Sequence, residues 1–144
     1  MLSVMNIYRC ARLLCITAAA LTTIACARPP VEVQDAWVRD LIGGRDTTAG
    51  YFHLRNNGQA PLNLTGARAG RARAIEMHET VTRGDGVGMR RLQQVNVPPG
   101  TELSFQPGGK HLMIFGVEQL TDPFAIELLF AEREPIVVQF TRKQ

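Results

Sequence analysis

The sequence predicts an all-β domain, either a sandwich or a barrel, from two observations. Short apolar runs that alternate with polar residues recur along the chain, and glycine- and proline-containing turn signals separate them. No stretch has a sustained helical period, no segment repeats, and no change of composition marks a second domain. About 117 residues remain after an N-terminal leader (144 minus 27), which is enough chain to bury a core without disulfide bonds.

Residues 1–27 are typical of an export signal. Arg9 and Arg12 supply its positive start, and Leu13–Ala25 is an apolar run that is short for a bilayer span. A pattern of two small residues separated by one residue predicts cleavage after Ala27.

A second interpretation makes Cys26 the lipidated cysteine of a bacterial lipoprotein, although Thr23 stands where such signals usually carry leucine. Both interpretations place residues 28–144 outside the cytoplasm, with membrane contact only if Cys26 is lipidated. The other two cysteines, Cys10 and Cys15, also lie in the leader, so the remaining domain has no disulfide bond.

The charge of the domain is nearly balanced. Two of the 16 basic residues lie in the leader, whereas all 13 acidic residues follow it, which leaves a net charge of +1. No basic run is interleaved with aromatic residues, so we expect no nucleic-acid partner. We expect the domain to be a monomer.

Turn signals separate many of the expected strands. The first, Val31–Arg39, alternates apolar and polar residues and places Trp37 in the core. A polar, glycine-containing loop over Asp40–Thr47 follows it. The later strands are expected at Thr48–Arg55, Leu62–Thr65, Ala72–Thr80, Val87–Leu92, Glu102–Gln106, His111–Val117, Ile126–Phe130 and Ile136–Thr141. The turns are expected at Asn56–Gly58, Gly66–Gly70, Thr82–Gly86, Pro98–Gly100 and Pro107–Gly109.

The histidines and methionines are concentrated in one stretch. The chain has three histidines and five methionines, and Met1 and Met5 lie in the leader. The other three methionines, and two of the histidines, fall between Met77 and Met113. Methionine is normally scattered through a core as adaptable filler, so sulfur gathered beside imidazole indicates a site.

Strand periodicity predicts how these side chains point. His111 and Met113 are two residues apart and share one face of a strand, while Leu112 and Ile114 point into the core.

The turn signal at Thr82–Gly86 predicts a hairpin that brings His78 near Met89, with a register uncertain by a residue or two. Met77 adjoins His78 and points to the opposite face, so we interpret it as a core residue and not as a ligand.

Two imidazoles and two thioethers without a thiolate select for one Cu(I) ion. Thioether sulfur suits Cu(I), whereas zinc sites use thiolate, imidazole or carboxylate, and a blue-copper centre needs a cysteine. The predicted ligands are His78, Met89, His111 and Met113.

The other polar residues are interpreted as structural. Carboxylate oxygen is a poor match for Cu(I), so we expect Glu76 and Glu79 in solvent and Asp85 in the turn. His53 has no methionine nearby and is expected to be a surface or hydrogen-bonded residue. No Ser-His-Asp order, paired carboxylates, phosphate loop or cysteine nucleophile is present, so we expect no enzyme. The alternative to a metal carrier is an exported β-sandwich that binds only protein and has an incidental His/Met cluster.

The spacing His-x10-Met-x21-His-x-Met resembles that of the periplasmic copper chaperones called PCuAC. Three further segments are similar to the same family, and together the similarities cover nearly the whole domain: Asp35–Arg39, Glu76–Thr80 and Gln106–Met113.

The resemblance implies a cupredoxin-like Greek-key barrel that binds one Cu(I) near its surface through these four residues. It also implies delivery of copper to the centres of cytochrome c oxidase, alongside Sco-type proteins. Some family members have a His- and Met-rich tail that binds extra copper. This chain ends at Thr141-Arg142-Lys143-Gln144, so we expect a single ion.

Overall fold

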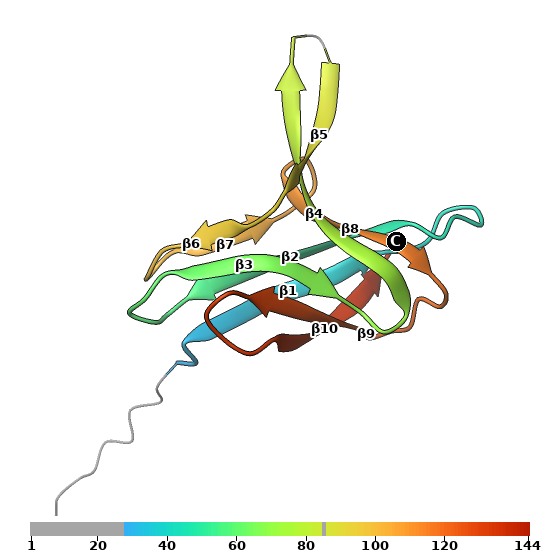
Figure 1. The fold of residues 1–144 in the computed structure, drawn as a ribbon. Helices are drawn as coiled ribbons and strands as arrows, with labels where there is room; N and C mark the ends of the chain where they lie inside the picture. The colour runs from blue at the N-terminus through green and yellow to red at the C-terminus, as the bar shows by residue number, and fades with distance from the viewer. Residues whose placement is uncertain (1–27, 85) are drawn as a thin grey trace, which may run out of the picture.

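The computed structural model describes residues 28–84 and 86–144, which form ten β-strands and no helix (Figure 1). The strands are β1 Val31–Arg39, β2 Thr48–Asn56, β3 Leu62–Arg68, β4 Ala72–Arg83, β5 Gly86–Leu92, β6 Val95–Val97, β7 Glu102–Phe105, β8 Lys110–Val117, β9 Phe124–Phe130 and β10 Ile136–Lys143. The all-β prediction is confirmed. No segment in the described part of the chain is a helix long and apolar enough to cross a bilayer. The predicted leader lies outside the described residues.

Two local predictions differ from the structure. The strand β6 was not expected, because three residues are too few to show a period. A turn was expected to begin at Gly66, but β3 continues through this residue to Arg68. The register shifts between Leu64 and Gly66, so the glycine marks an irregularity in a continuous strand and not its end.

The strands form one continuous sheet in the order β5-β4-β8-β7-β2-β1-β10-β9-β3-β6, in which β8 also pairs with β2. The sheet folds over on itself so that β3 contacts β4, and the core lies between the two halves. The hairpin of β4 and β5 extends beyond this body (Figure 1). The metal-ligating side chains predicted from the sequence therefore lie on β4, β5 and β8, at one end of the sheet.

Aromatic side chains fill the centre of the core. Phe52 on β2 is 1% exposed, stacks on Phe105 with ring centroids 4.5 Å apart, and meets Phe140 edge-on at 5.9 Å. On β9, alternate residues from Phe124 to Phe130 are buried, as expected for a strand with one face against the core.

The prediction that Trp37 lies in the core is wrong. The register of β1 against β2 shifts between Gln34 and Trp37, and Asp35 has a φ of 50°. The extra residue turns Val38 inward, where it is 0% exposed, in place of Trp37. Trp37 is instead half-buried at the surface, 4.4 Å from the ring of Tyr51.

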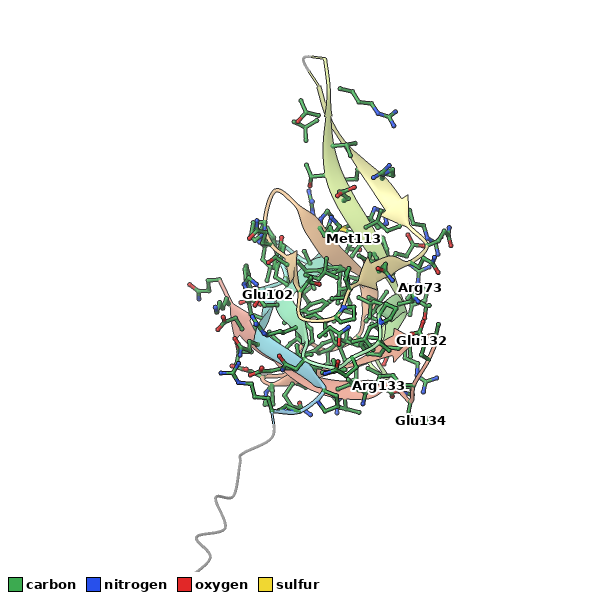
Figure 2. The ribbon with its side chains drawn as sticks, turned by 90° about the vertical axis from the view of Figure 1, so that its left-hand side faces the viewer. Arg73, Glu102, Met113, Glu132, Arg133 and Glu134 are labelled. Atoms are coloured by element: carbon green, nitrogen blue, oxygen red, sulfur yellow. The ribbon has the colours of Figure 1, made fainter. Side chains whose placement is uncertain are left out.

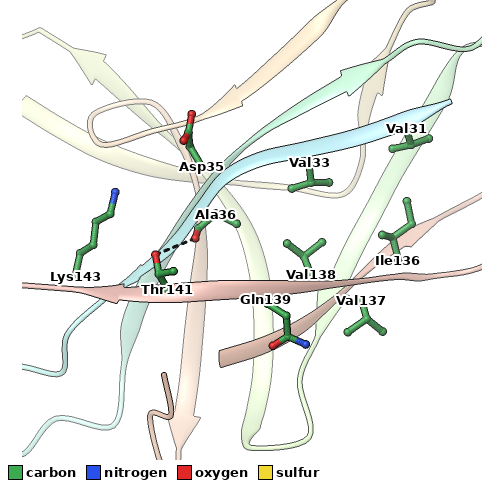
Figure 3. Close-up of a pocket in the computed structure, with 10 residues that line it drawn as sticks. All are labelled: Val31, Val33, Asp35, Ala36, Ile136, Val137, Val138, Gln139, Thr141 and Lys143. Atoms are coloured by element: carbon green, nitrogen blue, oxygen red, sulfur yellow. Dashed lines mark hydrogen bonds between the residues drawn. The ribbon is translucent and has the colours of Figure 1, made fainter. Parts of the chain in front are cut away.

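A groove of about 570 Å³ lies between β1 and β10 (Figure 3). The two strands pair in parallel only where Trp37–Arg39 meets Thr141–Lys143, and they diverge before that point. Valine and isoleucine side chains line much of the groove, and no histidine, cysteine or methionine is among its lining residues. The imidazole and thioether groups predicted to bind a metal therefore lie outside this groove.

Candidate metal centre

The β4–β5 hairpin carries two of the four predicted ligands. Its last pair is Arg83 with Gly86, which confirms the predicted hairpin, and Gly84 has a φ of 57° that suits glycine. Asp85, assigned to the turn, lies outside the described residues. His78 does not face Met89 across the hairpin.

The register places these two predicted ligands two positions apart. His78 pairs with Arg91, and Met89 pairs with Thr80. A shift of two residues keeps the side chains on the same face of the sheet, so Met89 and His78 still point to one side.

The strands β4 and β8 bring the two histidines together. His78 pairs directly with His111, and their ring centroids are 6.0 Å apart with an angle of 35° between the planes. Leu112 and Ile114 are 0% exposed in the core, as predicted. Met113 therefore lies on the same face as His111, at the base of the hairpin (Figure 2).

Three of the predicted ligands line one cavity of about 400 Å³: Met89, His111 and Met113. Tyr51 and Thr80 also line it, together with residues of the loop 40–47. Spacing in the sequence gave no signal for Tyr51 or the loop, because the loop and β2 are distant in the chain. His78 does not line the cavity, but its ring lies beside that of His111, which does.

The four side chains differ in their access to solvent. His111 is 6% exposed and Met113 is half-buried, whereas Met89 is 64% exposed. The cavity is thus closed on the β8 side by a buried imidazole, and on the hairpin side it is bordered by a thioether that can move.

His111 is oriented by the backbone of its own strand. Its Nδ1 lies 3.0 Å from the carbonyl oxygen of Gly109, which can only accept a hydrogen bond. The proton therefore sits on Nδ1, and the lone pair of Nε2 is available to a ligand.

His78 is oriented by Glu76, two residues earlier on the same face of β4. The ring Nε2 donates to the carboxylate at 2.9 Å, and Arg91 contacts the other carboxylate oxygen at 2.9 Å. The hydrogen bond from His78, followed by the charge of Arg91, lowers the pKa of Glu76 below its ordinary value. The second ring nitrogen, Nδ1, is buried without a hydrogen-bond partner among the described residues.

The expectation that Glu76 and Glu79 lie in solvent holds only in part. Their side chains are 26% and 23% exposed, and both are ion-paired. Glu79 points to the opposite face of β4, where it contacts Lys110 at 2.8 Å and Arg90 at 2.6 Å. The i, i+2 spacing of Glu76 and His78 was the signal that could have revealed the first contact.

Two other residues have the places expected of them. Met77 is 2% exposed in the core and is therefore turned away from the cavity. His53 lies on β2 and has its Nδ1 3.0 Å from the hydroxyl of Ser104, which makes it a hydrogen-bonded surface histidine.

The donor set depends on sulfur. Among residues 28–84 and 86–144, no three side chains of histidine, cysteine, aspartate or glutamate are grouped to hold a metal ion. Two imidazoles alone would make an incomplete site, and the two thioethers predicted as ligands would complete it only for an ion that accepts soft ligands. The arrangement is suited to a soft monovalent ion and poorly suited to zinc, calcium or magnesium.

Known proteins share this fold. The solved structure of the copper-bound PCuAC domain from PmoF2 superimposes with a TM-score of 0.68 at 17% identity, over 81% of this chain and 95% of that one. The solution structure of apo-DR1885 from Deinococcus radiodurans gives 0.62 at 25% identity, over 100% and 97%. These likenesses confirm the cupredoxin-like β fold.

A sequence relative and a family model agree with each other. "Putative lipoprotein Lxx21020" of Leifsonia xyli subsp. xyli is 31% identical over 113 residues, which cover 74% of this chain and 67% of the relative. The family model described as "Putative lipoprotein LpqE-like" matches residues 31–141. The chain therefore belongs to the LpqE-like family.

Proposed function

We propose that this protein is an exported carrier of Cu(I) and not an enzyme. One ion is bound by the four side chains His78, Met89, His111 and Met113. The observation that carries the proposal is the register of β4 and β8, which sets two imidazoles opposite each other with their centroids 6.0 Å apart.

This separation suits a shared ion. Metal–imidazole bonds are about 2.0 Å long and a ring nitrogen lies one bond length from the centroid, so an ion held by two rings sets the centroids roughly 5 to 6 Å apart. The thioether of Met113 lies on the same face of β8, and that of Met89 borders the same cavity. Met89 is exposed and has room to turn toward the ion.

Copper in two structural relatives supports the choice of ion. One is the copper-bound PCuAC domain from PmoF2, and the other is CuI-DR1885 from Deinococcus radiodurans, which is 28% identical over 87% of this chain with a TM-score of 0.63. The donor chemistry leads to the same ion, because thioether sulfur favours Cu(I).

The ligands suit transport better than storage. Neutral imidazole and thioether groups add no charge to Cu(I), so the ion can pass to an acceptor with thiolate ligands. Met89 is the ligand that an acceptor can replace first, because it alone of the four is largely exposed. The acceptor in this proposal is a copper centre of cytochrome c oxidase or a Sco-type protein.

Export is part of the proposal. Residues 1–27 act as a signal that is removed after Ala27, or alternatively Cys26 is lipidated and anchors the domain outside the cytoplasm. The word lipoprotein in the names of the family and of the relative supports export. Mass spectrometry of the mature N-terminus distinguishes the two routes, because only one leaves a lipidated cysteine.

The direct test is an anaerobic titration of the protein with Cu(I) against a competing chelator. We expect one equivalent to bind, and binding to weaken strongly in His111→Ala and Met113→Leu. His53→Ala is the matched control, because it removes an imidazole that is hydrogen-bonded outside the cavity. Circular dichroism establishes that each variant is folded.

Two results would reject the carrier. One is the absence of stoichiometric Cu(I) binding, and the other is binding that His111→Ala leaves intact. Either result leaves a β-sandwich that binds only protein. The acceptor is tested separately, by mixing the loaded protein with an apo CuA domain and measuring where the copper resides; copper that stays on the carrier argues against that acceptor.

A further inference from the structure

The two histidines of the site use different ring nitrogens for their hydrogen bonds. His111 uses Nδ1, which donates to the carbonyl oxygen of Gly109 at 3.0 Å. His78 uses Nε2, which donates to Glu76 at 2.9 Å. A carbonyl and an ionised carboxylate only accept hydrogen bonds, so the two rings are held in opposite tautomers.

The contact at His78 is built by two strands. Glu76 and His78 share a face of β4, and Arg91, the partner of His78 on β5, contacts the other oxygen of the carboxylate at 2.9 Å. One oxygen of Glu76 thus accepts the hydrogen bond of His78 and the other is ion-paired with Arg91, so the carboxylate cannot turn away from the ring without losing one of these contacts. This arrangement makes the orientation of the imidazole specific.

The remaining nitrogen of His78 has no partner. Its Nδ1 is buried and forms no hydrogen bond with any described residue. A buried polar atom is normally paired, and an unpaired one destabilises the fold unless a ligand takes it. Because Glu76 holds the proton on Nε2, the free lone pair of this ring is on Nδ1.

We propose that Glu76 is a positioning residue that makes Nδ1 of His78 the atom that binds Cu(I), while His111 binds through Nε2. The inference rests on the proposed function and specifies the geometry of the same site. Glu76 does not touch the ion. Binding through Nε2 of His78 would instead require the ring to turn and to break its contact with Glu76.

A neighbouring carboxylate provides the matched control. Glu79 also lies on β4, is buried to a similar extent and is also ion-paired, but it points to the opposite face toward Lys110 and Arg90. Glu79→Ala therefore removes the same charge and the same number of atoms as a carboxylate-to-alanine change at position 76, without touching either imidazole.

The first measurement uses the ¹⁵N-labelled protein without copper, in mildly alkaline buffer. Long-range ¹H–¹⁵N spectra report which ring nitrogen carries the proton. We expect the proton on Nε2 of His78 and on Nδ1 of His111. Glu76→Ala should mix the two tautomers of His78, whereas Glu76→Gln should preserve the native one, because an amide oxygen can still accept from Nε2.

The second measurement adds Cu(I). The ¹⁵N signal of Nδ1 should move for His78 and that of Nε2 for His111. Removing a group that orients a metal ligand typically weakens binding 10- to 100-fold, so we expect at least a roughly 10-fold weaker Kd for Glu76→Ala. Glu76→Gln and Glu79→Ala should stay close to the wild-type value.

The results separate the two proposals. A proton on Nδ1 of His78 in the copper-free protein, a copper-induced shift at Nε2 of His78, or equal weakening by Glu79→Ala would each overturn the role of Glu76, even if the protein carries copper. Failure of the wild-type protein to bind Cu(I) would overturn the proposed function and the assignment of the ligand atoms with it.

Discussion

Replacing Met89 or Met77 by leucine should affect stability differently, depending on whether copper is bound. Met89 on β5 is 64% exposed and Met77 on β4 is 2% exposed. Without copper, Met89→Leu should change the free energy of unfolding by no more than about 0.5 kcal/mol, as surface substitutions do. Met77→Leu alters a packed core while conserving volume, so it should cost a measurable amount below about 1.5 kcal/mol.

With Cu(I) bound, Met89→Leu should become the more destabilising of the two substitutions. A ligand that binds only the folded state stabilises it in proportion to the logarithm of its excess over Kd, so a 10-fold weaker Kd removes about 1.4 kcal/mol of that stabilisation. If Met89 is a ligand, Met89→Leu should lose at least this amount, which is a thermal shift of roughly 5 °C for a domain of this size. Met77→Leu should keep the full copper-induced shift from its lower starting point.

The assay is thermal unfolding of each variant under anaerobic conditions, with and without a fixed excess of chelator-buffered Cu(I). The comparison within each variant cancels the effect of the substitution on the copper-free protein. The reasoning fails if Met89→Leu keeps the full shift, or if Met77→Leu loses it while its fold stays intact.

Three further predictions concern the fold. Phe52→Ala should destabilise the domain by about 3–5 kcal/mol in urea denaturation, because the ring is 1% exposed between two other phenylalanines, and a loss below 1 kcal/mol would contradict this packing. Gly116→Ala should cost about 1–3 kcal/mol, since its φ is 62° and a Cβ would lie 2.6 Å from that of Arg73, whereas Gly88→Ala, with open space around it, should cost less. The pKa of Glu79 lies below its ordinary value of 4.5, first because of its hydrogen bond with Lys110 and then because of Arg90, so its contribution to stability is complete above that value and is lost as the pH falls through the lower folded pKa. Denaturation from about pH 7 to pH 3 should show less acid destabilisation in Glu79→Gln than in the wild type.

Local patterns were sufficient to predict most of the strands and the shared face of His111 and Met113. Alternation and turn residues located nine of the ten strands, and the spacing of His111 and Met113 put them on one face. The same pattern failed at Asp35, where one extra residue in β1 moved Trp37 out of the core. Alternation cannot anticipate such a bulge, because the inserted residue looks like any other polar position.

The relation between the strands could not be predicted. Nothing local to His78 or His111 specifies that they pair directly, because the register of β4 against β8 is set by the packing of their opposite faces in the core. The same holds for the two-residue offset of Met89 and for the closure of the cavity by the loop 40–47. The contact of Glu76 with His78 was visible in the spacing, but its partner Arg91 depended on the hairpin register.

The strands β5 and β8 flank β4 in the sheet, and their backbone hydrogen bonds should open at different rates. The first six residues of β5 are exposed and the strand lies at the outer edge of the sheet, so its amide hydrogens should exchange with solvent by local fraying. β8 lies between β4 and β7 and contains the 0%-exposed Leu112 and Ile114, so its amides should exchange only when the whole domain unfolds. An ion bound as proposed would link these regions through Met89 and His111, so slower exchange along β5 would report that the site is loaded.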